Sequence, residues 1–62
     1  MDVCKVTNTN NGRTLDADVL QRGDKRIRVA IQNTDLTITM TRDDVRRPYV
    51  GRVAGLEFTS MG

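Results

Sequence analysis

Two arginines, Arg26 and Arg28, are separated by one residue in a segment where polar and apolar side chains alternate. Alternate residues of a β-strand lie on the same face of a sheet, so both guanidinium groups are expected to share one face. A guanidinium group donates hydrogen bonds in a planar fork that suits phosphate and carboxylate oxygens. The pair therefore forms the start of a candidate anion-binding surface.

The same surface is expected to continue over the next polar segment, where threonine occupies positions 37, 39 and 41. Guanidinium and hydroxyl groups on a sheet can hold the phosphate backbone of RNA or DNA. Tyr49 is the one aromatic side chain expected at the surface, so platforms on which bases could stack are scarce. The residues predicted to contact nucleic acid are Arg26, Arg28, Thr39, Arg42, Arg46 and Arg47.

The charge balance permits this interpretation without requiring it. Ten Lys+Arg residues against eight Asp+Glu residues give a formal net charge of +2, and most of the cations are arginines. Arginine loses less conformational freedom per hydrogen bond than lysine, which favours an anionic partner. The alternative is that the arginines pair with the aspartates across strands and only support the sheet. Both interpretations stay open from the sequence.

The residue types present exclude several kinds of catalytic and metal site. The chain has no histidine and one cysteine, and its only glutamate is Glu57, which excludes a histidine-based triad, a multi-cysteine zinc site and a disulfide framework within one chain. The aspartate pairs at 16 and 18 and at 43 and 44 lack the loop of a calcium site, so they are assigned to pairing and turn capping. We therefore expect no enzyme activity, no metal and no cofactor, and we expect Cys4 in the core.

The sequence also favours a cytoplasmic protein without a membrane partner. No run approaches the ~20 apolar residues of a membrane span. No apolar stretch of the kind found in signal peptides follows Met1, and the unpaired Cys4 is unusual for secreted proteins. A cytoplasmic location is the resulting prediction.

Alternation with period two runs through most of the chain, which is typical of half-buried strands. Asn11-Gly12 is a strong hairpin signal. Acids followed by arginines at residues 43–47 fit the dipole of one short 3₁₀ turn, which ends before Pro48. Five strands are predicted, from Val3 to Thr9, Arg13 to Gln21, Lys25 to Gln32, Asp35 to Arg42 and Tyr49 to Thr59.

The parity of the apolar positions predicts how neighbouring strands pair. A two-residue loop, Asn33-Thr34, places Val29 opposite Ile38 and Arg28 opposite Thr39. A three-residue loop at 22–24 places Val19 opposite Ile27 and Asp18 opposite Arg28. The second pairing would engage Arg28 in the sheet and would weaken its role as a ligand-binding residue.

Fourteen side chains are expected to point inward, and other apolar residues have no assigned interior place. Those other residues could cap the fold or form a subunit contact, so we expect a homo-oligomer built by edge pairing of the first or last strand. They are Val3, Leu20, Val45, Tyr49, Val50, Val53 and Met61. The inward set is Cys4, Val6, Leu15, Ala17, Val19, Ile27, Val29, Ile31, Leu36, Ile38, Met40, Ala54, Leu56 and Phe58.

The expected fold is all-β: one domain over residues 1–62, made of a small five-stranded antiparallel sheet that is strongly bent or closed into a barrel. The order of hairpins, short 3₁₀ turn and last strand, with alternation at 15–19 and 27–31, resembles the SH3-like and Sm-like small barrels. No motif of those families matches residue by residue, so the resemblance implies the shape and no functional residues. The sequence favours a small non-catalytic binding or assembly module that acts through protein contacts and self-association. The alternative is an RNA- or DNA-binding barrel that uses the arginine and threonine face.

Overall fold

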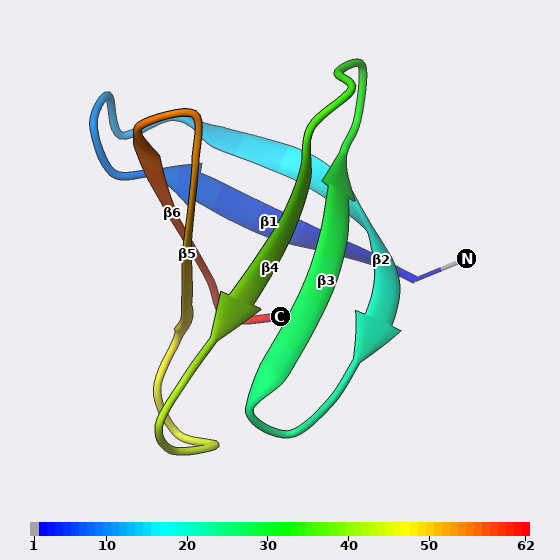
Figure 1. The fold of residues 1–62 in the computed structure, drawn as a ribbon, viewed down its shortest axis with the longest axis vertical. Helices are drawn as coiled ribbons and strands as arrows, with labels where there is room; N and C mark the ends of the chain where they lie inside the picture. The colour runs from blue at the N-terminus through cyan, green and yellow to red at the C-terminus, as the bar shows by residue number, and fades with distance from the viewer. Residues whose placement is uncertain (1) are drawn as a thin grey trace.

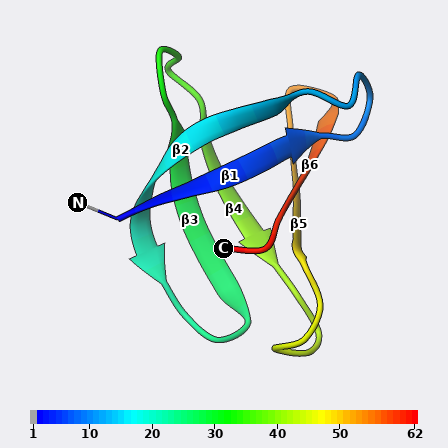
Figure 2. The ribbon, with the colours of Figure 1, turned by 180° about the vertical axis from the view of Figure 1, so that it is seen from behind.

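Alternating side chains build a closed antiparallel barrel in the computed structural model, which describes residues 2–62 (Figure 1). Each strand pairs with the next, and the last pairs with the first; seen from behind, the first two strands cross in front of the third and fourth (Figure 2). The all-β prediction is confirmed, but the described residues form six strands and not five. They are β1 (Val3–Asn8), β2 (Thr14–Arg22), β3 (Arg26–Ile31), β4 (Thr37–Thr41), β5 (Tyr49–Val53) and β6 (Leu56–Ser60).

The additional strand arises because the predicted last strand is a hairpin. Ala54 and Gly55 have φ values of 53° and 76°, and Val53 lies opposite Leu56 across them. Positive φ at both central residues matches the twist of a two-residue β-hairpin. The inward position predicted for Ala54 is wrong, because this residue is exposed in the turn. Alanine carries no turn signal, and its left-handed conformation is imposed by the pairing of β5 with β6.

The predicted 3₁₀ turn at 43–47 is also wrong, since no helix of any kind forms in residues 2–62. The backbone N–H of Arg47 donates to the Asp44 carbonyl at 3.0 Å, which closes a single turn. The Asp44 carboxylate accepts the N–H of Arg46 at 2.8 Å, and side-chain bonds of this type compete with helical bonding. The described part of the chain accordingly has no helix that could cross a membrane.

Most of the side chains predicted to point inward lie in the core. Nine of the predicted side chains are buried, and Val19, Leu36 and Leu56 are partly buried against them. Leu15 is 39% exposed, because it is the second residue of β2 and lies at the barrel rim beside a surface hollow that Asn33 also borders. Tyr49, expected at the surface, is buried instead. The buried set is Cys4, Val6, Ala17, Ile27, Val29, Ile31, Ile38, Met40, Tyr49 and Phe58.

The predicted pairing of β3 with β4 is confirmed. Val29 lies opposite Ile38, and Arg28 lies opposite Thr39. The loop between them is longer than predicted, because Gln32 donates its backbone N–H to Asp16 of β2 at 3.0 Å, while Ile31 donates to the Leu36 carbonyl. Four residues, 32–35, therefore separate Ile31 from its partner Leu36. An even number preserves the side-chain parity, so the arginine and threonine face forms as expected.

Candidate functional site

The pairing of β2 with β3 decides what surrounds Arg28. The predicted alignment of Asp18 with Arg28 is wrong, because Asp18 lies opposite Ala30 and Val19 lies opposite Val29. The register shifts between Val19 and Gln21, so that Gln21 becomes the partner of Arg28. This irregularity is a β-bulge that absorbs Leu20, whose side chain is 55% exposed.

The shift removes the carboxylate that was expected to neutralise Arg28. Asp18 accepts a hydrogen bond from Gln32 Nε2 at 3.1 Å. Within residues 2–62, no carboxylate oxygen lies within 4.0 Å of a nitrogen of Lys25, Arg26 or Arg28. The four ion pairs in this part of the chain use other cations. These three charges are therefore available to a ligand.

The free cations border one surface hollow of about 620 Å³ that extends across β2, β3 and β4. We call its lining the basic face. Among the described residues that line it there is no acid, and Arg22 is paired with Asp2 outside the lining at 2.9 Å. Thr37, Thr39 and Gln21 add hydroxyl and amide groups. The basic face consists of Gln21, Arg22, Gly23, Lys25, Arg26, Arg28, Thr37 and Thr39.

Arg42, which the sequence predicts as a contact residue, is partly buried and makes contacts within the protein. Its guanidinium group lies 4.1 Å from the centre of the Tyr49 ring. Its Nε donates to the Asp24 carbonyl at 2.5 Å, and its backbone N–H donates to the Lys25 carbonyl at 2.9 Å. The Tyr49 hydroxyl donates to the Gly23 carbonyl at 2.5 Å. Arg42 and Tyr49 thus hold the loop between β2 and β3 that borders the basic face.

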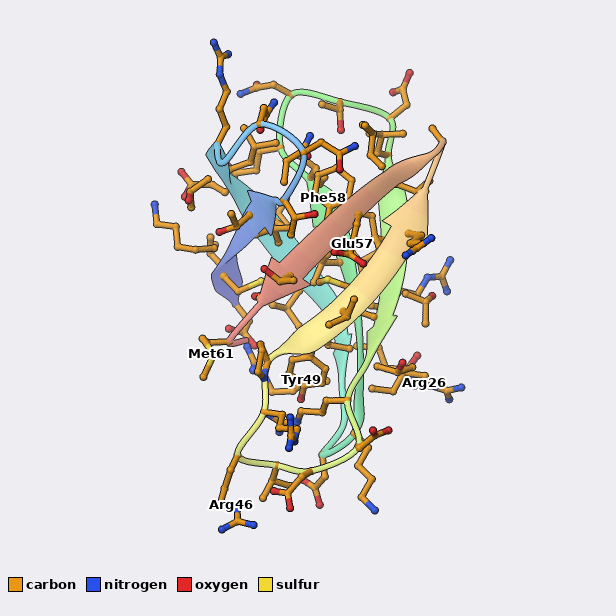
Figure 3. All side chains as sticks on the ribbon, turned by 90° about the vertical axis from the view of Figure 1, so that its left-hand side faces the viewer. Arg26, Arg46, Tyr49, Glu57, Phe58 and Met61 are labelled. Carbon is orange, nitrogen blue, oxygen red and sulfur yellow. The ribbon has the colours of Figure 1, made fainter. Side chains whose placement is uncertain are left out.

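Arg46 and Arg47 lie in the loop between β4 and β5 and do not line the basic face. Figure 3 shows Arg46 at the end of this loop, well separated from Arg26 on β3. The Arg46 guanidinium group contacts both carboxylate oxygens of Asp44 at 3.2 Å. Arg47 borders another hollow beside Thr41 and Pro48. Of the six predicted contact residues, the fold brings together Arg26, Arg28 and Thr39.

The pairing with Arg46 also sets the acidity of Asp44. The side-chain and backbone hydrogen bonds from Arg46 lower the pKa of Asp44 below the ordinary 3.8. A lowered pKa stabilises the folded loop above pH 3.8, and that stabilisation is lost as the pH falls through the folded-state value. Arg46 therefore stabilises the turn through its hydrogen bonds to Asp44.

Sequence reasoning missed Gln21, Arg22 and Lys25 as members of the basic face. Gln21 and Arg22 reach it because the bulge at Leu20 displaces the end of β2 along β3. Lys25 reaches it because the backbone N–H of Arg42 donates to the Lys25 carbonyl and fixes the loop. A bulge at an exposed leucine has no glycine or proline signal, so alternation alone could not reveal it.

The arrangement provides positive charge, hydrogen-bond donors and hydroxyl groups, and it lacks aromatic rings. Tyr49 and Phe58 are the only aromatic residues of the chain, and both point into the barrel with 2% and 1% of their surface exposed (Figure 3). In residues 2–62, no three side chains of His, Cys, Asp or Glu are grouped where they could hold a metal ion. The chemistry that the basic face can perform is the binding of anions.

Comparisons with protein-family models, with curated proteins and with solved structures found no match to this chain. The resemblance to SH3-like and Sm-like barrels therefore stays a prediction about shape.

Proposed function

We propose that this protein is a non-catalytic binding module whose basic face binds the phosphate backbone of RNA or DNA. The observation that carries the proposal is the cluster of Lys25, Arg26 and Arg28 around one hollow without an ion-paired carboxylate within the described residues. Desolvated or clustered cations without acidic partners are stabilised by an anionic ligand. A cytoplasmic location, which we propose with this function, is consistent with the buried free thiol of Cys4.

The spacing of the cations favours a polymer of anions over a single small anion. Arg26 and Arg28 project from the same side of β3, two residues or roughly 6.6 Å apart. Lys25 lies in the bend directly before the strand and borders the same hollow. A nucleic acid backbone presents phosphates at repeated intervals of the same order, so several contacts can form at once. The hydroxyls of Thr37 and Thr39 can donate further hydrogen bonds to phosphate oxygens.

The double variant Arg26→Ala with Arg28→Ala tests this function. Each lost phosphate contact lowers the slope of log affinity against log salt by about 0.9, so the slope should fall by about 2. The affinity at low salt should fall by roughly tenfold or more. Fluorescence anisotropy with labelled RNA and DNA at several salt concentrations measures both quantities.

The matched control is Arg46→Ala with Arg52→Ala, which removes the same amount of charge. Both arginines are exposed and paired with acids, Asp44 and Glu57, and neither lines the basic face. This variant should keep the salt slope of the unmodified protein. Equal losses in the two double variants would mean that net charge alone drives binding. A protein that binds neither RNA nor DNA at low salt would refute the proposal.

Self-association is a second candidate function, and the junction of β1 with β6 favours it. Two residue pairs join these strands in residues 2–62, Thr7 with Thr59 and Asn8 with Phe58. Beyond them a groove of about 570 Å³ is bordered by Val3 and Met61, which are 47% and 70% exposed. A partly unpaired strand edge beside apolar side chains can pair with the same edge of a second copy.

Sedimentation at about 100 µM, well above the Kd of most specific interfaces, tests this candidate. We expect a dimer or larger species, and Val3→Lys with Met61→Lys should shift it to monomer because charge opposes edge pairing. A monomer at that concentration would exclude it.

A further inference from the structure

On the premise that the basic face binds nucleic acid, we infer that its preferred ligand is a duplex and not a single strand. This inference adds to the proposed function by naming the form of the ligand. It rests on three properties of the described residues: where the aromatic side chains lie, how densely the cations are clustered, and how firmly the face is held.

The first property is the absence of a stacking surface. Proteins that hold single strands draw much of their affinity from aromatic rings on which successive bases stack. The chain contains one tyrosine, one phenylalanine and no tryptophan, and both rings are buried in the barrel. Arg42, whose planar group could also stack on a base, lies against Tyr49. A single strand would therefore meet the basic face through its phosphates alone.

The second property is the density of charge. Lys25, Arg26 and Arg28 border a single hollow, so three cations without an ion-paired carboxylate in residues 2–62 meet in one small area, whereas Arg22 beside them is paired with Asp2. A duplex carries one phosphate per roughly 1.7 Å of its axis, twice the density of one strand. Clustered cations contact more phosphates on the denser ligand. With stacking absent, this electrostatic difference decides the preference.

The third property is the preorganisation of the face. Arg26, Arg28, Thr37 and Thr39 lie on paired strands, and the adjoining loop is held by the Tyr49 hydroxyl on the Gly23 carbonyl. A rigid surface matches a ligand that is already ordered, whereas a flexible single strand loses conformational freedom when it is held on such a surface. Rigid phosphate contacts carry no direct sequence information, so binding should depend little on base sequence.

The experiment compares a labelled 20-nucleotide strand, its complement, the DNA duplex of the two and the RNA duplex of the same sequence. Fluorescence anisotropy measures the affinity of the full chain for each nucleic acid at about 50 mM salt. At least one duplex should bind roughly tenfold more tightly than either single strand. A duplex of shuffled sequence should bind within about threefold. The two duplex arms show whether the backbone of DNA or of RNA fits better.

A second variant, Thr39→Tyr, tests the reason for the preference. Residue 39 lies on the outer side of β4 in the basic face, and aromatic residues suit strands. The added ring should raise single-strand affinity by roughly five- to tenfold and narrow the difference from the duplex. An unchanged ratio would overturn the stacking argument. Single strands that bind the unmodified protein as tightly as duplexes would overturn the inference alone, whereas no binding of any nucleic acid would overturn the proposed function as well.

Discussion

Replacing Gly51 with valine is expected to leave most of the protein unfolded. Gly51 lies in β5 where this strand approaches β4 closely. A β-carbon at this position would lie 2.5 Å from Met40 Cγ, 2.8 Å from the Thr39 carbonyl oxygen and 3.0 Å from Ile38 Cγ2. One of these atoms belongs to the backbone, so it cannot move without disturbing the pairing of β4 with β3. A glycine within a strand commonly marks such a close approach.

The size of the effect follows from the small total stability of a short chain. Adding a single methyl group to a packed site destabilises by about 1–3 kcal/mol, and Gly51→Ala should reach the upper part of this range. Valine adds two further carbons to the same space. At about 0.05–0.15 kcal/mol per residue, a domain of this length has a total free energy of unfolding of about 3–9 kcal/mol. The loss expected for valine therefore reaches the total stability, and most of the protein should be unfolded.

Urea unfolding followed by circular dichroism measures the change, with Gly55→Ala as the matched control for Gly51→Ala. Gly55 has a φ of 76°, and a β-carbon there would meet no atom within 4 Å. Its replacement should cost about 1–2 kcal/mol from backbone strain alone. Equal losses at the two glycines would mean that contact between β5 and β4 does not depend on Gly51.

Most of the inward set and the pairing of β3 with β4 could be predicted because both depend on local parity. Apolar residues at odd positions from Ile27 to Ile31 and at even positions from Leu36 to Met40 can face one core in a single register. The loop proved longer than predicted, yet an even number of residues preserved the outcome. The placement of Arg26, Arg28 and Thr39 on one face followed from the same pattern.

The bulge at Leu20 and the left-handed turn position of Ala54 could not be predicted, because neither residue type favours its conformation, although Gly55 beside Ala54 does suit a turn. Leu20 lies in a regular alternating segment, and its bulge changes the partner of Arg28 from an aspartate to Gln21. Ala54 takes a φ of 53° that alanine disfavours, and only pairing of β5 with β6 compensates for it. In both cases the tertiary pairing overrides local preference.

Tyr49 shows that non-local contacts also limit what the sequence predicts about the candidate site. Its hydroxyl donates to a carbonyl 26 residues earlier in the chain, and its ring contacts Arg42, which directly follows β4. Nothing near residue 49 in the sequence indicates either contact. The expectation that Tyr49 lies at the surface was therefore wrong because the sequence does not show its non-local contacts, one of which also engages the Arg42 guanidinium group.

Replacing Tyr49 with alanine is the second change expected to have a large effect. The side chain is 2% exposed and is one of the largest in the core. Truncation of a buried aromatic residue destabilises by about 3–5 kcal/mol, which is a large fraction of the total stability of this chain. Tyr49→Phe keeps the ring and removes only the hydroxyl, so it should destabilise by about 1–3 kcal/mol because the Gly23 carbonyl loses its partner.

The two variants together separate the effect of packing the Tyr49 ring in the core from the effect of the hydroxyl that holds the loop at Gly23. Urea unfolding gives the stabilities, and amide hydrogen exchange of Tyr49→Phe reports on the loop. The N–H groups of Gly23 and Arg42, which donate to the Arg26 and Lys25 carbonyls, should exchange faster, whereas the N–H of Val29 in the paired part of β3 should keep its relative protection. Uniform acceleration at all three would mean that the hydroxyl stabilises the whole barrel and does not hold the loop. Local acceleration, accompanied by weaker binding at the basic face, would show that the Tyr49 hydroxyl determines how well the surface cations are positioned.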